Sequence, residues 1–215
     1  KYLKGGSFRR WYGNLDYVLY YNRNSDFIKQ QKNATVLPLT KLREPKCTWT
    51  DLTSGPFNSR FAPIDTFHDI SGHCFYPTEK NQLQLLGYTN TKVFSNLINI
   101  INSSFHFQVG DVAKIPVIEP NPDEIQCINS LVNQLLEISK LDWDSRENSW
   151  DFLRNGIVSL CLNDEQELES FYDMFVQRWQ VKFFIIHQKE EELNQRFIDI
   201  YGLTEELSFS VPLEE

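Results

Sequence analysis

The stretch EQELESFYDMFVQRWQVKFFIIHQKEEELNQRFIDIY, residues 165–201, decides the architecture of the second half of the chain. Its apolar side chains recur every three or four residues, as on one face of an α-helix: Leu168, Tyr172, Phe175, Trp179, Phe183, Ile186, Leu193 and Phe197. We therefore predict one long helix over residues 165–201, with Gly202 as its C-terminal cap. Residues 181–187 are apolar nearly all round and should be buried on several sides. The acidic run 190–192 is typical of a solvated helix face.

Shorter elements surround this helix. The period of three to four also predicts a helix beginning at Asp123, two helices in 82–103 separated by Gly87, and a short helix over 145–154. Residues 105–118 return to an extended pattern. Residues 7–76 are rich in aromatic and β-branched side chains broken by turn signals, which favours short antiparallel strands. The expected fold class is α+β, with a mixed β-rich domain at 1–118 and a helical spacer or docking region at 119–215.

Charge is distributed unevenly along the chain. Residues 1–60 carry 11 Lys and Arg against 4 Asp and Glu, a net +7, residues 61–118 are at −1, and residues 119–215 carry 7 against 21, a net −14; these sum to −8. The gradient predicts a basic functional face near the N-terminus and a solvated acidic C-terminal part. The plainer alternative is two halves with unequal surfaces.

Composition excludes several classes of protein. Apolar residues make up 41% of the chain, which excludes a disordered protein. No apolar run approaches the ~18 residues that would cross a bilayer, and no secretory signal is visible. The four cysteines have no C-x-x-C spacing, so we expect reduced thiols in a cytoplasmic protein. Because the chain begins at Lys1 without Met, we interpret it as a fragment or a processed chain.

The sequence offers no catalytic signature. It contains no P-loop, no G-x-S-x-G, no H-E-x-x-H, no G-x-G dinucleotide signature and no Asn/Asp/Ser-Pro-Pro-aromatic tetrapeptide. Gly5 and Gly6 form only a glycine pair. The run HDISGHC at 68–74 combines possible zinc ligands, but it lacks a second ligand pair, so we assign no catalytic residue and no metal site.

The basic and aromatic N-terminal region is the better candidate for function. Lys and Arg neutralise phosphates, Arg also reads guanine edges, and short hydroxyl side chains contact phosphates or bases. This composition favours contact with nucleic acid, and we predict that the basic side chains form one positive face rather than pairing with the acidic helices. The alternative is that Arg9 and Arg10 merely cap or stack on Trp11 and Tyr12. The candidate DNA-binding residues are Lys4, Arg9, Arg10, Trp11, Tyr12, Arg43, Lys46, Thr48, Thr50, Ser59 and Arg60.

Four blocks of sequence stand out: KGGSFRRWYGN at 4–14, TWTDLTSG at 48–55, LLGYTNTKV at 85–93 and NQRFIDIYGL at 194–203. These blocks resemble those of large bacterial adenine-specific DNA methyltransferases. Such enzymes are the single-chain methyltransferases of BREX phage-defence systems, which are related to type IIG restriction-modification enzymes. The resemblance covers nearly the whole chain. The histidine in FHD, at residues 67–69, departs from the pattern, so no role is carried over to it.

The resemblance implies the C-terminal target-recognition region of such an enzyme. The catalytic methyltransferase domain of the same parent chain would flip an adenine and transfer a methyl group from S-adenosylmethionine to N6. This chain lacks the motifs for that step, so we expect it neither to methylate DNA nor to bind the cofactor. The implied partners are double-stranded DNA and the catalytic domain, without a membrane, in the bacterial cytoplasm.

Two other classes stay open from the sequence. One is a specificity subunit of a multi-subunit restriction system, although such subunits usually have two recognition domains and two long helices. The other is a helical protein-interaction module in which the basic region is incidental. Steeply salt-dependent DNA binding separates this module from the first two readings.

Overall fold

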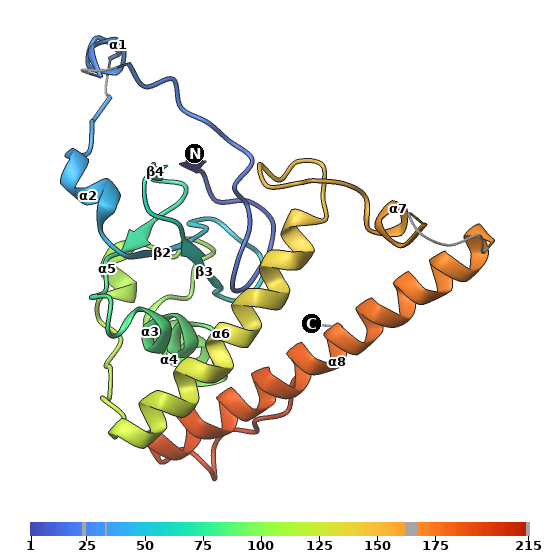
Figure 1. Cartoon of the computed structure of the whole chain (residues 1–215). Coiled ribbons are helices and arrows are strands. Elements are labelled where there is room, and N and C mark those ends of the chain that lie inside the picture. Colours follow the sequence, from blue (N-terminus) through green and yellow to red (C-terminus); the bar gives the residue numbers. More distant parts are fainter. Residues whose placement is uncertain (23–24, 33, 162–166, 214–215) are drawn as a thin grey trace.

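The computed structural model describes residues 1–22, 25–32, 34–161 and 167–213. Its short strands lie in the first half of the chain, and its two longest helices lie in the second half (Figure 1). The structure therefore confirms the α+β class. The division into two domains at residue 118 stays a prediction.

Two small sheets lie in the first half. In one, β1 (Tyr2–Leu3) runs parallel to β4 (Phe67–His68). In the other, β2 (Lys46–Trp49) lies between β3 (Ser59–Ala62) and β5 (Cys74–Phe75), and both neighbours run antiparallel to it. All four residues of β2 are buried, as expected for a central strand.

Helices form the remainder of the regular structure. Those of the first half are α1 (Asp26–Lys29), α2 (Leu39–Arg43), α3 (Gln82–Thr89), α4 (Lys92–Ile101) and α5 (Val109–Val112). Those of the second half are α6 (Pro122–Asp144), α7 (Gly156–Cys161) and α8 (Leu168–Tyr201). The Asn121 side chain caps α6 by accepting a hydrogen bond from the Glu124 N–H, and Gly202 ends α8 at φ 66°. The predicted cap at Gly202 is thus confirmed.

One hydrophobic core joins the sheet to the helices. The rings of Trp49 and Phe57 pack at 5.8 Å between centroids with their planes inclined by 42°, and the Trp49 indole donates a hydrogen bond to the carbonyl of Phe107. Helix α6 packs against both α3 and α8. A Cβ atom on Gly87 of α3 would lie 2.9 Å from Val132 of α6, so only glycine permits this close approach.

Helix α8 packs on the rest of the chain along one part of its length. Its C-terminal part contributes Leu193 and Phe197 to the core. Its N-terminal part leads away from the other elements, with α7 beside its far end (Figure 1). Phe184 is 59% exposed and Val181 is 54% exposed. The prediction that residues 181–187 are buried on several sides is therefore wrong within this chain.

Other boundaries differ from those expected. Asn90 and Thr91, rather than Gly87, separate α3 from α4, and the Thr91 side chain caps α4. Residues 109–112 form a helical turn, and residues 145–154 form turns instead of a helix. The predicted start of the long helix at 165 lies outside the described residues. Within the described ranges, no helix is long and apolar enough to span a membrane.

Candidate nucleic-acid interface

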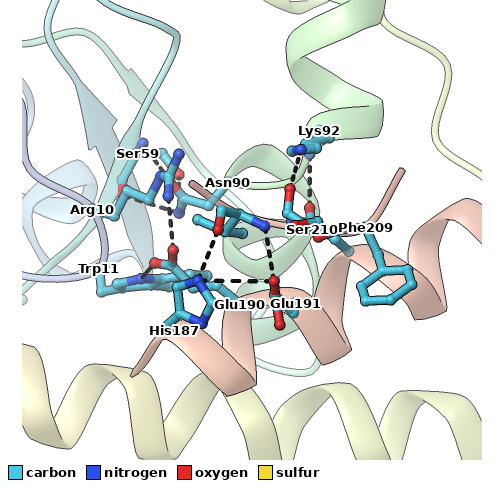
Figure 2. A network of polar contacts seen from close by, with 12 residues as sticks. Arg10, Trp11, Ser59, Asn90, Lys92, His187, Glu190, Glu191, Phe209 and Ser210 are labelled. Atoms are coloured by element: carbon cyan, nitrogen blue, oxygen red, sulfur yellow. Dashed lines mark hydrogen bonds and ion pairs between the residues drawn. The ribbon is translucent and has the colours of Figure 1, made fainter. Parts of the chain in front are cut away.

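The N-terminal motif FRRWYGN, residues 8–14, packs into the junction between the strands and the two long helices. Trp11 is 2% exposed, and its indole N–H donates a 2.6 Å hydrogen bond to Oε1 of Glu190 on α8. The Arg10 guanidinium donates to Oε2 of the same carboxylate at 2.8 Å. Figure 2 shows both side chains converging on Glu190. The carboxylate therefore fastens α8 to the motif through two oxygens.

Arg9 makes a second connection, to α6. Its guanidinium forms an ion pair with Asp142, donates to the carbonyl of Tyr12 at 2.7 Å and lies 5.1 Å from the ring centroid of Trp143. Gly13 has φ 127°, and a Cβ atom there would lie 2.3 Å from Nε of Arg9. The turn after Tyr12 thus needs glycine to admit the arginine. We call Arg9, Arg10 and Trp11, with Asp142, Trp143 and Glu190, the clamp.

The predicted residues on β2 and β3 serve the interior. Arg60 is 1% exposed and donates to Asn58 Oδ1 at 3.0 Å and to Thr50 Oγ1 at 3.2 Å. Burial lowers the pKa of Arg60 to about 10. Lys46 is fully buried, its ammonium donates to the carbonyl of Leu42 at 2.9 Å, and burial lowers its pKa. Ser59 shares a 2.6 Å hydrogen bond with Thr89.

Few of the eleven predicted DNA-binding residues are exposed. The side chains of Lys4 and Arg43 are exposed, those of Arg9, Arg10 and Thr50 are partly buried, and the other six are buried: Trp11, Tyr12, Lys46, Thr48, Ser59 and Arg60. The expectation that the basic side chains avoid the acidic helices is wrong for Arg9 and Arg10, because α6 and α8 supply their counter-charges. DNA contact by any of the eleven stays a prediction.

A second basic and aromatic segment lies at the surface. We call residues 17–44 the arm; it contains five Lys and Arg against two Asp and Glu. Lys32 and Arg43 are exposed, and the rings of Tyr17 and Tyr20 are 52% and 70% exposed. Nζ of Lys4 lies 5.6 Å from the centroid of the Tyr17 ring, so Lys4 extends this surface. The arm therefore gathers cations and aromatic rings in contact with solvent.

The arm is attached to the sheets near its two ends. The Tyr2 N–H donates to the carbonyl of Tyr17 at 2.9 Å, and the Asp65 N–H donates to that of Leu42 at 2.8 Å. Between these points the arm passes over the N-terminal strand and carries α1 and α2, at the side of the molecule away from α8 (Figure 1). A cavity of about 530 Å³ lies between the arm and the strands, lined in part by Ile28 and Phe67. The basic arm therefore lies beside this cavity.

Helices α6 and α8 carry an excess of acidic residues. Helices α6 and α8 together carry eleven Asp and Glu against five Lys and Arg. Asp142 and Glu190 belong to this set, and both are used by the clamp. The remaining negative charge of these helices disfavours the close approach of phosphates.

The chain is similar to short segments of two larger proteins. No known protein-family model matches it. It is 28% identical over 218 residues to the adenine-specific methyltransferase PglX of Lacticaseibacillus casei (strain Zhang), a match that covers 96% of this chain and 18% of PglX. It is 30% identical over 159 residues to the adenine-specific methyltransferase BrxX of Escherichia coli O9:H4 (strain HS), which covers 72% of this chain and 13% of BrxX.

The chain is homologous to a segment of adenine-specific methyltransferases. It spans less than a fifth of the length of either PglX or BrxX. The resemblance seen in the sequence is thereby confirmed. The match to PglX covers 96% of the chain, so it includes both the strands and the two long helices.

The histidines of this methyltransferase homologue have partners of their own. Asp51 lies between two of them, with Oδ1 3.5 Å from His73 Nε2 and Oδ2 3.0 Å from His106 Nδ1. His68 Nε2 lies 2.7 Å from the hydroxyl oxygen of Tyr76. In the part of the chain that the structure describes, no group of His, Cys, Asp and Glu is arranged to hold a metal ion.

Sequence reasoning missed the importance of Glu190. The run 190–192 was interpreted as a solvated face, yet the Glu190 side chain is only 11% exposed. One signal was present: Glu190 continues the apolar stripe, four residues after Ile186 and three before Leu193. A carboxylate on the inward face of a helix requires a buried donor, and Trp11 and Arg10 supply two.

Proposed function

We propose that this chain is the DNA-recognition part of a site-specific adenine-N6 DNA methyltransferase of a phage-defence or restriction-modification system. The arm and Lys4 contact the duplex, and the clamp joins the helical region to the recognition region. Such an enzyme acts on double-stranded DNA in the bacterial cytoplasm. Its partner is the catalytic part of the same polypeptide.

The exposed basic arm is the observation that carries this proposal. Lys32 and Arg43 on the arm, together with Lys4, present ammonium and guanidinium groups to solvent, where they suit phosphate oxygens. Tyr17 and Tyr20 beside them offer ring faces and hydroxyl groups. The clamp arginines are the poorer candidates, because DNA would have to compete with carboxylates already in place.

We assign S-adenosylmethionine to the catalytic part of the polypeptide. The glycine pair at residues 5 and 6 is not arranged as a cofactor-binding loop. A Cβ atom on Gly5 would lie 2.6 Å from the carbonyl oxygen of Ser71, and one on Gly6 would lie 2.7 Å from Asn14. These glycines make room for the protein's own chain, not for a ligand. When bound elsewhere, the cofactor supplies the methyl group.

Duplex binding by single alanine variants tests the proposal. Lys4→Ala, Lys32→Ala and Arg43→Ala should each weaken binding, and each lost phosphate contact should reduce the slope of log K against log salt by about one. Arg154→Ala is the matched control. Arg154 is exposed in the helical region, and its substitution removes the same charge. Fluorescence anisotropy at several salt concentrations measures both quantities.

The outcomes separate the functional classes. No binding of duplex DNA at low salt would support the helical interaction module instead. Binding that all three arm variants retain unchanged would place the DNA on another surface. A variant that no longer discriminates between bases at one position of the target, with a loss of about 1–3 kcal/mol in binding free energy on the true site, would identify that residue as a base contact.

A further inference from the structure

The projecting part of α8 carries a second stripe of side chains, separate from the one that enters the core. Its members recur at alternating spacings of four and three residues: Ser170, Met174, Gln177, Val181, Phe184 and Gln188. All six are exposed. We call them the seam. A spacing of 3.5 residues that continues over 19 residues is the geometry by which two helices pack side by side.

The seam contains no charged residue, unlike its borders. With Met174, Val181 and Gln188 as a positions and Ser170, Gln177 and Phe184 as d positions, Asp173 falls at g and Arg178 at e. Asp173 and Arg178 are both exposed, and neither has an ion-pair partner within the described residues. One border therefore carries an acidic residue and the other a basic residue, five positions apart; the other g positions are Gln180 and His187, and the other e positions are Phe171 and Ile185.

These borders decide the direction of a partner helix that has the same sequence. In a parallel pair, a g residue faces the e residue five positions later on the other helix. Asp173 of each copy then faces Arg178 of the other, which gives two attractive contacts. In an antiparallel pair g faces g and e faces e, which places like borders together. The charges thus favour two parallel copies related by a two-fold axis.

We propose that the seam of α8 pairs with the same seam of a second copy of this chain, in a parallel two-stranded arrangement. The apolar contacts come from Met174, Val181 and Phe184, which are 39%, 54% and 59% exposed in the single chain. The seam is about 27 Å long at 1.5 Å per residue. Three apolar positions over that length make a small interface, so the association is weak and reversible.

Sedimentation equilibrium of the 215-residue chain, up to about 1 mM, tests the proposal. The chain should show a monomer–dimer equilibrium. Phe184→Glu should weaken dimerisation about a hundredfold or more, because an exposed ring that the pairing buries is replaced by a charge. Leu168→Glu is the matched control, since Leu168 is 69% exposed on the same helix but lies outside the seam.

A charge exchange tests the direction of pairing. Asp173→Arg and Arg178→Asp should each weaken dimerisation about tenfold, and the double variant should restore it. Both residues are exposed, and far-ultraviolet circular dichroism verifies that each variant is folded. A chain that stays monomeric at 1 mM overturns the proposal and leaves the seam to a helix of a longer polypeptide. A dimer in which the double variant is no better than the single ones overturns the parallel register. Neither result depends on DNA binding.

Discussion

The clamp motif and the arm have similar compositions and opposite environments. Both are basic and aromatic, and only Leu15 and Asp16 separate residues 8–14 from residues 17–44. In the motif, Trp11 is buried and the arginines pair with Asp142 and Glu190. In the arm, cations and rings remain in contact with solvent. The difference comes from carboxylates more than 120 residues away in sequence, which reach the motif and not the arm.

This comparison teaches that a basic, aromatic composition does not by itself identify a DNA-binding surface. A buried guanidinium needs a carboxylate or a carbonyl partner, and acidic helices can supply one. The same side chains without such partners stay hydrated and available to phosphates.

Trp11→Ala should have the largest effect. The indole is 2% exposed and donates to Glu190, so its loss creates a cavity and leaves a buried carboxylate oxygen without its donor. We expect unfolding to become easier by about 3–5 kcal/mol, measured by urea denaturation. Tyr20→Ala on the arm, at a ring that is 70% exposed, is the control and should cost less than about 0.5 kcal/mol. Equal effects of the two would refute the assignment of the clamp.

Glu190→Gln should cost about 1–3 kcal/mol. The amide keeps the shape of the side chain but removes the negative charge that faces the partly buried Arg10 guanidinium, which weakens this charge-assisted contact. Glu192→Gln is the matched control from the same acidic run, because Glu192 pairs with Arg196 near the surface and should change stability by less than about 0.5 kcal/mol. A small loss from Glu190→Gln, similar to that of the control, would show that α8 is not held by the carboxylate.

Lys46→Met should change how stability depends on pH. Burial lowers the pKa of Lys46 below its ordinary value of 10.5, so the unfolded chain binds more protons than the folded chain between the lowered pKa and 10.5. The unfolding free energy of the natural chain should therefore rise relative to that of the variant as pH increases through this window. Urea denaturation at neutral and alkaline pH measures the difference, with Lys32→Met as the exposed control. A difference that stays constant across this window would contradict the prediction.

Arg43→Ala should have the smallest effect on stability. Arg43 is exposed at the end of α2, so we expect a change within about 0.5 kcal/mol by thermal or urea denaturation. Its effect on duplex affinity should nevertheless be measurable, as proposed above. A large loss of stability would mean that the arm, like the clamp motif, has a structural role.

Much of the fold follows from local sequence. The period of the apolar residues identified α6 and α8, and Gly202 marked the end of α8. The predicted start at Asp123 lies one residue inside α6, and the cap at Asn121 was not predicted. The site was predicted less well, because exposure depends on residues distant in sequence. Nothing around Arg10 reveals that Glu190 will face it. Likewise, Lys46 belongs to a central strand whose two neighbours are set by tertiary pairing.

The clamp contacts α8 at Glu190, nearer to the C-terminal end of the helix than to its N-terminal end. Glu190 divides α8 unequally. About 33 Å of helix extends from Glu190 to Leu168, and about 16 Å extends from Glu190 to Tyr201. A rotation of about 5° at Glu190 would displace Leu168 by about 3 Å, twice the displacement at the other end. The shorter, C-terminal part of α8 is packed into the core, and the longer, N-terminal part carries the seam. A force applied at the seam would therefore act on Glu190, and through it on Arg10 and Trp11, with a longer moment arm than a force applied at the end of α8 in the core.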